Sequence, residues 1–369
     1  MLRNRLRTSD VVARLGGDEF AVLLPVLDRA GADVVAADLV QLIRDTVSVL
    51  DGSRPRTVTA SLGLVLIQDP HMTSSELLST VDMTMYDAKD AGRDRYVVHD
   101  SSEFPVPRTG ARIAWASRIE AALHNDGFRI HAQPILDVPT GRITGAELLI
   151  RMIDDDGDLI MPGRFLYIAE RTSLIVGIDS YMLTQAARLL ASLRHVDPDF
   201  TISVNLSGRN VGHPVISALI PRLIEEYDFN AGNLIMEITE TAAVADIETA
   251  RTFAEHLRGL GCRFALDDFG AGFGSFYYLK HLVFDFVKID GEFVAKSPTN
   301  AADRLIITSI VDIARGLGKK TVAEFVSDDD ILATVTELGV DRAQGYHIGR
   351  PMPIEQLIDQ LTTAGRHRS

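Results

Sequence analysis

The sequence of 369 residues has little of several features that would define other classes of protein. Cys262 is the only cysteine, so no disulfide can form within the chain, and a reducing, cytoplasmic compartment is expected. The first residues, MLRNRLRTSD, have no apolar core for a signal peptide, and no uninterrupted apolar run is long enough to span a bilayer. Positive charge is also scarce, with 37 Lys and Arg against 51 Asp and Glu, a net charge of −14. This balance argues against a nucleic-acid-binding surface, and an anionic ligand would need local neutralisation, for example by carboxylate-bound metal ions.

The length of the chain is enough for two or three domains, and a break in composition divides it. The segment HDSSEFPVPRTG, residues 99–110, gathers Ser, Pro, Thr and Gly between two patterned regions and is typical of a linker. We therefore expect a first domain at residues 1–100, a linker at 101–110 and a second domain at 111–369.

The second domain alternates strand-like and helix-like segments. Strand-like runs occupy residues 128–136, 143–151, 201–207, 233–240, 263–268, 284–290, 320–326 and 340–346. Most are separated by stretches with helical periodicity, such as IDSYMLTQAARLLASL. Such alternation favours a parallel α/β sheet, and eight strands in this length predict a closed TIM-type (β/α)8 barrel.

Polar residues stand near the ends of seven successive strand-like runs. They are Glu147, Asn205, Glu237, Asp267 with Asp268, Lys288, Glu324 and Gln344. In a TIM-type barrel the carboxyl ends of all strands surround one mouth, where active sites lie. Helix caps would instead favour Ser, Thr, Asp and Asn, so the Glu, Lys and Gln residues indicate a site.

The segment FALDDFGAGFGSFYYL, residues 264–279, places two carboxylates side by side. One interpretation is an acidic turn followed by a flexible loop, because such residues are common in turns. The other is a cation held between the carboxylates of Asp267 and Asp268, which would offset their repulsion. A site of carboxylate and amide oxygens suits Mg²⁺ or Mn²⁺, and two such ions about 3.5–4 Å apart support phosphoester hydrolysis. Lys288 would add a fixed positive charge beside the attacking water or the phosphate.

The sequence blocks around these residues resemble the EAL family of cyclic-di-GMP phosphodiesterases. The similar blocks, in family order over residues 111–365, are QPILDVPTGRITGAELLIR, VNLS, EITE, DDFGAGFGSFYYL, KID, AEFV and QGY. The resemblance implies a modified TIM barrel that hydrolyses cyclic-di-GMP to linear pGpG with Mg²⁺ or Mn²⁺, two ions being expected. It also implies a homodimer formed through the barrels.

The resemblance further implies a role for each matching residue. The metal ligands would be Glu147, Asn205, Glu237, Asp267 and Asp268, and the catalytic residues Glu324, Lys288 and Asp268. Neighbouring cations would lower the pKa of Glu324, the candidate general base. The substrate-binding residues would be Gln133, Leu149, Arg151 and Gln344, and Glu240 would anchor the loop that carries the Asp pair.

Several positions depart from the family pattern. Leu148 replaces the central Ala of the signature, Ala271 replaces a Thr or Ser, and in AEFVS Phe325 replaces Gly and Ser327 replaces Glu. Leu148 is larger than the residue it replaces and would shift Glu147. None of these changes removes a candidate ligand, which favours a phosphodiesterase. The alternative is a non-catalytic cyclic-di-GMP receptor, whose family members lose strand-end carboxylates.

The first domain resembles part of a GGDEF, or diguanylate cyclase, domain in the segment RTSDVVARLGGDEFAVLLP. Gly16, Gly17, Asp18 and Glu19 match the signature turn, and Arg7 with Asp10 matches the RxxD site of that family. The family's first strand, with a metal-binding Asp and a guanine-reading Asn, precedes the signature and has no counterpart here. We therefore expect a partial α+β domain without cyclase activity.

Overall fold

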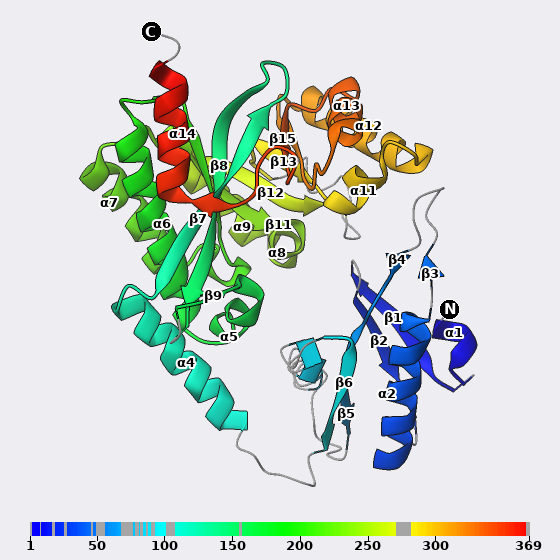
Figure 1. Ribbon diagram of the computed structural model, residues 1–369. Helices are drawn as coiled ribbons and strands as arrows, with labels where there is room; N and C mark the ends of the chain where they lie inside the picture. The colour runs from blue at the N-terminus through cyan, green and yellow to red at the C-terminus, as the bar shows by residue number, and fades with distance from the viewer. Residues whose placement is uncertain are drawn as a thin grey trace. The chain divides into compact units, whose positions relative to one another are not determined.

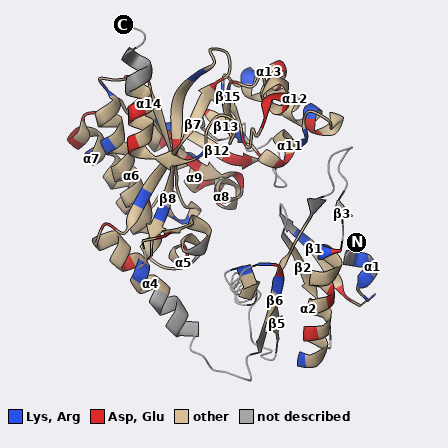
Figure 2. Ribbon diagram, in the orientation of Figure 1, with Lys and Arg blue, Asp and Glu red and all other residues tan. Residues whose placement is uncertain are grey.

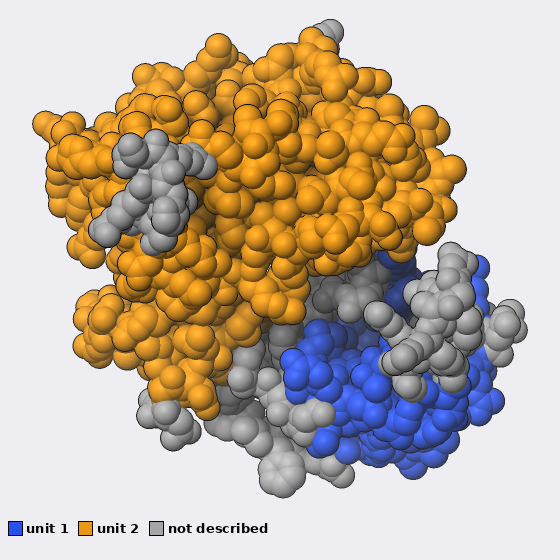
Figure 3. Space-filling view, turned by 45° about the horizontal axis from the view of Figure 1, so that its top comes forward, with its two compact units in different colours: residues 1–111 blue, residues 112–369 orange. Residues whose placement is uncertain are grey.

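The computed structural model of the chain comprises two compact units, Met1–Ala111 and Arg112–Ser369 (Figures 1 and 3). The residues that the structure describes are 2–7, 9–16, 19–25, 28–45, 47–48, 56–67, 77, 81, 84–85, 88–89, 93–100, 108–154, 157–270 and 282–366. Within these residues no helix is long and apolar enough to cross a membrane.

The first unit is a small α+β arrangement, as predicted. Its elements are α1 (Leu2–Arg5), β1 (Val11–Gly16), β2 (Glu19–Leu23), α2 (Arg29–Arg44), β3 (Val47–Ser48), β4 (Arg56–Thr57), β5 (Ser61–Leu66) and β6 (Arg95–Asp100). Strands β1 and β2 form an antiparallel hairpin, while β5 and β6 pair in parallel. Asp28 caps α2 by accepting a hydrogen bond from the backbone N–H of Gly31 at 2.8 Å.

The second unit is built on a closed barrel of eight strands with helices outside it (Figure 1). The barrel strands are β7 (Phe128–Asp137), β8 (Arg142–Ile153), β10 (Thr201–Asn205), β11 (Leu234–Thr239), β12 (Arg263–Phe269), β13 (Phe286–Ile289), β14 (Lys320–Ala323) and β15 (Arg342–Gln344). Each coincides with one of the eight strand-like runs, so the predicted barrel is confirmed. Two short strands, β9 (Leu159–Ile160) and β16 (Met352–Pro353), extend the sheet beside β8 and β7.

One strand departs from the parallel arrangement that the alternation predicted. Strand β7 pairs antiparallel with both of its barrel neighbours, β8 and β15, whereas the other adjacent barrel strands pair in parallel. Only residues 138–141 join β7 to β8, and Gly141 at a φ of 65° completes this tight turn. A parallel crossover needs about a dozen residues or more, so this connection forces the reversal.

The helices cover the outer face of the barrel and bury its apolar side chains (Figure 1). They are α4 (Arg108–His124), α5 (Leu166–Ala169), α6 (Leu174–Leu193), α7 (Pro214–Tyr227), α8 (Glu240–Ala245), α9 (Ile247–Gly259), α11 (Gly291–Lys296), α12 (Ala301–Gly316), α13 (Asp329–Glu337) and α14 (Ile354–Arg366). Asn300 caps α12 and Asp328 caps α13 through side-chain oxygens that accept backbone N–H groups. The charged residues of this unit are interspersed over its helices (Figure 2).

The inside of the barrel is filled in layers, as the period of two along each strand requires. One apolar cluster inside it consists of Ile135, Ile235, Ala265, Phe286 and Val322. Four of these residues precede Glu237, Asp267, Lys288 and Glu324 by two positions. On the antiparallel β7, Ile135 instead follows Gln133 by two. The predicted polar residues therefore form the layer directly above this cluster.

Candidate active site at the carboxyl ends of the barrel strands

Lys288 on β13 lies at the centre of the polar layer. Its Nζ atom is 2.7 Å from Oε2 of Glu237, 2.9 Å from Oδ1 of Asp267 and 2.9 Å from Oε1 of Glu324. Oε2 of Glu147 is farther away, at 3.4 Å. The side chain of Lys288 is buried, and its four acidic neighbours come from four different strands or the residue directly after a strand. One ammonium thus offsets part of the repulsion among four carboxylates gathered in a low-dielectric interior.

Glu147 on β8 is held by a separate hydrogen-bond network. Asn205 Nδ2 donates to its Oε1 at 2.6 Å, and Gln344 Nε2 donates to its Oε2 at 2.7 Å. Gln344 also donates to Gln133 Oε1 at 3.2 Å, and Gln133 in turn donates to the carbonyl of Gly349 at 3.2 Å. The network therefore fixes the orientations of three amide side chains around one carboxylate.

A second group of carboxylates has the geometry of a cation site. One oxygen from each of Asp267, Asp268 and Glu324 lies within 4.8 Å of the others. Asp268 is exposed, and it adopts the left-handed backbone region at a φ of 52°, which turns it out of the strand. Oxygen donors alone suit Mg²⁺ or Mn²⁺, so this group fits such an ion. Glu147 and Glu237, also predicted as ligands, are outside this three-residue group in the described chain.

Burial and charge shift the pKa values of these groups in different directions. Asp268 is exposed on one side, but partial desolvation of its carboxyl group by the surrounding protein, reinforced by the charge of Asp267, raises its pKa to about 6. Burial also raises the pKa of Glu237 and of Glu324 to about 8, against the lowering effect of Lys288. For Glu147, burial acts upward, but Lys288 and the hydrogen bonds of Gln344 and Asn205 outweigh it and lower the pKa. Burial by itself would lower the pKa of Lys288, but the surrounding carboxylates outweigh this effect and hold the pKa well above its ordinary value.

Leu149 and Arg151, the predicted substrate-binding residues of β8, alternate with buried apolar residues beyond Glu147. Leu149 is half-buried, and Arg151 is 6% exposed and donates from Nη1 to the carbonyl of Ile150 at 2.8 Å. Both follow Glu147 by an even number of residues, so they share its face of the strand. Arg151 thereby lies beyond the polar layer, on the side of the mouth.

The backbone after the Asp pair is held by the predicted loop anchor. Glu240, at the start of α8, accepts a hydrogen bond at its Oε2 from the N–H of Gly270 at 3.0 Å. Its other oxygen is buried without a hydrogen-bond partner among the described residues. This bond fixes the chain two residues after Asp268.

The positions that depart from the family pattern lie in different surroundings. Leu148 is buried among the apolar side chains outside the barrel, on the face of β8 opposite to Glu147, so its extra volume lies away from the carboxylates. Ser327 is at the surface and donates to Asp328 Oδ2 at 3.0 Å. Phe325 is exposed beside Glu324, and Ala271 lies outside the described residues.

The residues of the first-unit motif are only partly described. Gly16 ends β1 and pairs with Glu19 at the start of β2, while Gly17 and Asp18 lie outside the described residues. Arg7 and Asp10 form a turn in which the backbone N–H of Arg7 donates to Asp10 Oδ2 at 2.7 Å.

Arg342 is a residue of the barrel interior that the strand-end pattern did not predict. It is 7% exposed, donates from Nη1 to Thr201 Oγ1 at 3.2 Å and lies 4.7 Å from the centre of the Phe286 ring. Its position two residues before Gln344 was the available signal, because alternate residues share a face. Arg342 therefore puts a second buried cation in the layer below Lys288.

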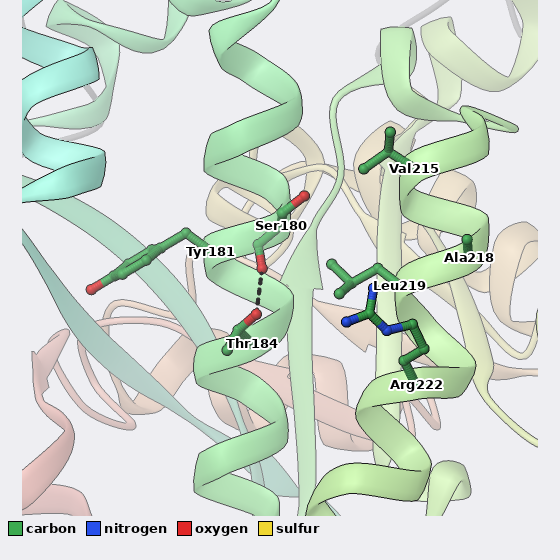
Figure 4. Close-up of a pocket in the computed structure, with 7 residues that line it drawn as sticks. All are labelled: Ser180, Tyr181, Thr184, Val215, Ala218, Leu219 and Arg222. Carbon is green, nitrogen blue, oxygen red and sulfur yellow. Dashed lines mark hydrogen bonds between the residues drawn. The ribbon is translucent and has the colours of Figure 1, made fainter.

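A surface groove of about 460 Å³ lies elsewhere, between α6 and α7 (Figure 4). Ser180 and Thr184 of α6 line it, opposite Val215, Leu219 and Arg222 of α7. None of the predicted site residues contributes to this groove.

The site and fold together define a class of protein, a mixed α/β barrel that gathers carboxylates at its strand ends. The EAL domain family matches residues 116–351, and the chain belongs to this family. The family "Diguanylate cyclase, GGDEF domain" matches residues 1–95. The N-terminal region is therefore a partial GGDEF domain.

Two relatives are similar over nearly the whole chain. The bifunctional diguanylate cyclase/cyclic di-GMP phosphodiesterase MucR of Pseudomonas aeruginosa is 34% identical over 97% of this chain and 52% of its own length. The cyclic di-GMP phosphodiesterase PdeB of Shewanella oneidensis is 33% identical over 98% of this chain and 42% of its own length. The chain thus spans about half the length of these relatives.

A solved structure, the PaMucR phosphodiesterase in a c-di-GMP complex, is similar with a TM-score of 0.63 and 34% identity. The match covers 66% of this chain and 99% of that chain. The eight-stranded barrel is therefore the EAL fold.

Proposed function

We propose that the chain hydrolyses cyclic-di-GMP to linear pGpG with Mg²⁺ or Mn²⁺. The observation that carries this proposal is the cluster of Asp267, Asp268 and Glu324, whose oxygens lie within 4.8 Å of one another beside Lys288. The proposal is supported by relatives at about 33% identity that are named as phosphodiesterases of this nucleotide.

The reaction adds one water to one of the two phosphodiester bonds. The water oxygen forms a bond to phosphorus, the bond from phosphorus to the 3′-oxygen breaks, and that oxygen leaves with a proton. A divalent cation, when bound, would stabilise charge on the phosphate and lower the pKa of the water. Asp267 and Asp268 would hold it, with Glu147, Asn205 and Glu237 as further candidate ligands.

Glu324 is the proposed general base. Burial raises its pKa to about 8, while Lys288 acts in the lowering direction that was expected of a neighbouring cation. A base is most effective when its pKa lies near the working pH. Lys288, 2.9 Å away, orients this carboxylate, and it is itself fixed by the other acidic residues.

Arg151 and the amides would orient the substrate. The guanidinium of Arg151 already donates to Ile150 from Nη1, which leaves its other N–H groups to face a phosphate. Gln133, Leu149 and Gln344 would line the same side of the mouth.

The decisive experiment follows pGpG by chromatography with purified protein and Mg²⁺, Mn²⁺, Ca²⁺ or EDTA. We expect turnover with Mg²⁺ and Mn²⁺ and little with Ca²⁺, because its longer and looser coordination misplaces the water. Turnover that persists in EDTA would contradict the metal mechanism. Tight binding of cyclic-di-GMP without any turnover would support the receptor alternative. Light scattering would test the proposed homodimer.

A further inference from the structure

Phe325, directly after Glu324, has an unusual backbone conformation for an aromatic residue. Its φ is 55°, in the left-handed region that normally favours glycine, and it is 69% exposed. Burial of an aromatic side chain is favourable, and a left-handed backbone at an aromatic residue is unfavourable. Phe325 is exposed and has this backbone, so neither effect accounts for a Phe at this position. Backbone outliers of this kind collect at functional sites.

The ring of Phe325 is nevertheless seated in a defined place. A Cβ atom at Gly291 would lie 2.1 Å from Cδ2 of Phe325 and 2.5 Å from Cγ, so the ring packs directly against the Gly291 backbone. Only glycine at position 291 leaves room for it. One side of the ring therefore packs against the start of α11, and its exposure leaves the other side open to solvent.

This ring belongs to the rim of the carboxylate site. Gly291 follows Asp290, whose backbone N–H donates at 3.3 Å to the carbonyl of Phe269, the residue directly after Asp268. Glu324, the residue before Phe325, is one of the three carboxylates of the cation group. The peptide 324–325 thus presents a buried carboxylate to the inside and an aromatic ring to the outside.

We infer that Phe325 is a stacking platform for a guanine base of the substrate, an inference that rests on the proposed function. A phosphate held through a cation at Asp267 and Asp268, beside Glu324, has its base one sugar away, at the rim. A rigid ring with one open side suits a planar base, because base–aromatic stacking needs only a π face. Phe325 acts on affinity for the dinucleotide and takes no part in the bond-breaking step.

The test compares variants of Phe325 that distinguish three contributions to substrate affinity: the π face of the ring, its apolar area and the strain of its backbone. We expect Phe325→Ala and Phe325→Gly to raise KM for cyclic-di-GMP about tenfold or more, the scale of one lost stacking contact, with kcat within a few-fold. Gly suits the left-handed backbone, so this variant shows the loss without added strain. Phe325→Trp should retain the parent KM, and Phe325→Leu should not. Leu305→Ala, at a similarly exposed apolar residue of α12, is the matched control.

A spectroscopic measurement makes the test independent of turnover. Cyclic dinucleotide with 2-aminopurine in place of guanine loses fluorescence when the base stacks, and we expect strong quenching with the parent and the Trp variant. The Leu and Gly variants should quench much less. Gly291→Ala should displace the ring and reproduce the loss, while the same change in the Phe325→Gly background should have no further effect.

The outcomes separate the two proposals. If Phe325→Leu has the KM of the parent, or if the Ala and Gly variants lower kcat as much as they raise KM, stacking on Phe325 is contradicted. The proposed phosphodiesterase activity is not affected by either result. If the parent binds the dinucleotide without turnover, the fluorescence quenching of the parent and its variants is the test of stacking on Phe325. A parent that neither binds nor hydrolyses cyclic-di-GMP overturns both.

Discussion

Lys288 Nζ lies 2.9 Å from Glu324 Oε1 and 2.9 Å from Asp267 Oδ1, so one buried ammonium joins the proposed base to a proposed metal ligand. The two carboxylates share this cation, but substitution of each is expected to have a different effect on turnover and on nucleotide affinity. Their separate roles give the first prediction.

Glu324→Gln keeps the shape of the side chain and removes its charge. We expect turnover of cyclic-di-GMP to fall at least about 100-fold, the scale of acid–base residues, while affinity for the nucleotide falls much less. Asp267→Asn should weaken both, because the phosphate is held through the cation. Rates from a product assay and affinities from calorimetry distinguish the two, and Glu337→Gln on α13 is the exposed control. A Glu324→Gln variant that turns over within a few-fold of the parent would remove Glu324 as the base.

Lys288→Met removes the buried cation that lies between four carboxylates. We expect a loss of about 3–5 kcal/mol in unfolding free energy in EDTA, because the charges left behind are uncompensated. Added Mg²⁺ should restore more stability to this variant than to the parent. Lys296→Met, at an exposed lysine paired with Glu292, should change little. Denaturant unfolding with and without Mg²⁺ measures these differences, and equal effects of both substitutions would contradict the prediction.

Cation binding should depend on pH. Burial, reinforced by Asp267, raises the pKa of Asp268 to about 6, and burial raises that of Glu324 to about 8, so both bind protons that a cation must displace. We expect Mn²⁺ affinity to increase as pH rises through this range, with proton release seen by calorimetry in two buffers of different ionisation enthalpy. Affinity that stays constant, with no proton released, would be inconsistent with a cation held by Asp268 beside Glu324.

Asp179 on α6 gives a prediction for stability away from the carboxylate layer. Burial raises its pKa to about 7, although Asn210 Nδ2 and the N–H of Ser207 donate to its Oδ2 at 2.6 and 3.1 Å. The folded state therefore holds a proton that the unfolded state releases near pH 4, and stability falls as pH rises from about 4 to 7.

Asp179→Asn retains an oxygen acceptor and removes this dependence. We expect the variant to gain stability over the parent, on the order of a few kcal/mol, at pH 8 and much less at pH 5. Urea unfolding at both pH values measures the gain, with Asp199→Asn as a surface control. A variant that is less stable than the parent at pH 8 would show that the charged carboxylate is favourable.

The alternation of strand-like and helix-like segments predicted the barrel, and the polar residues near the ends of the strand-like runs predicted the polar layer. Residues 320–326 show this well, since Val322 lies in the apolar layer and Glu324 in the polar one. The reversal of β7 was missed because a strand-like run has no direction. The four-residue connection 138–141 was the signal that a parallel crossover cannot form.

The charge distribution within the site was harder to predict. The sequence did not indicate that four carboxylates surround Lys288. Distances of this kind depend on how far each strand is displaced along its neighbours, which sequence spacing does not determine. The outward turn of Phe325 depends on a left-handed backbone that no aromatic residue favours by itself, and so it was also unpredictable.

The pairing of β7, the first strand of the barrel, with the last strand has a consequence for how the protein is made. Its residues pair with Arg342–Gln344 and Met352–Pro353, about 200 positions later, so the seam of the barrel cannot close while the ribosome is still translating the last strands. Until then β7 has only its hairpin partner β8, and its other edge stays open to foreign strands.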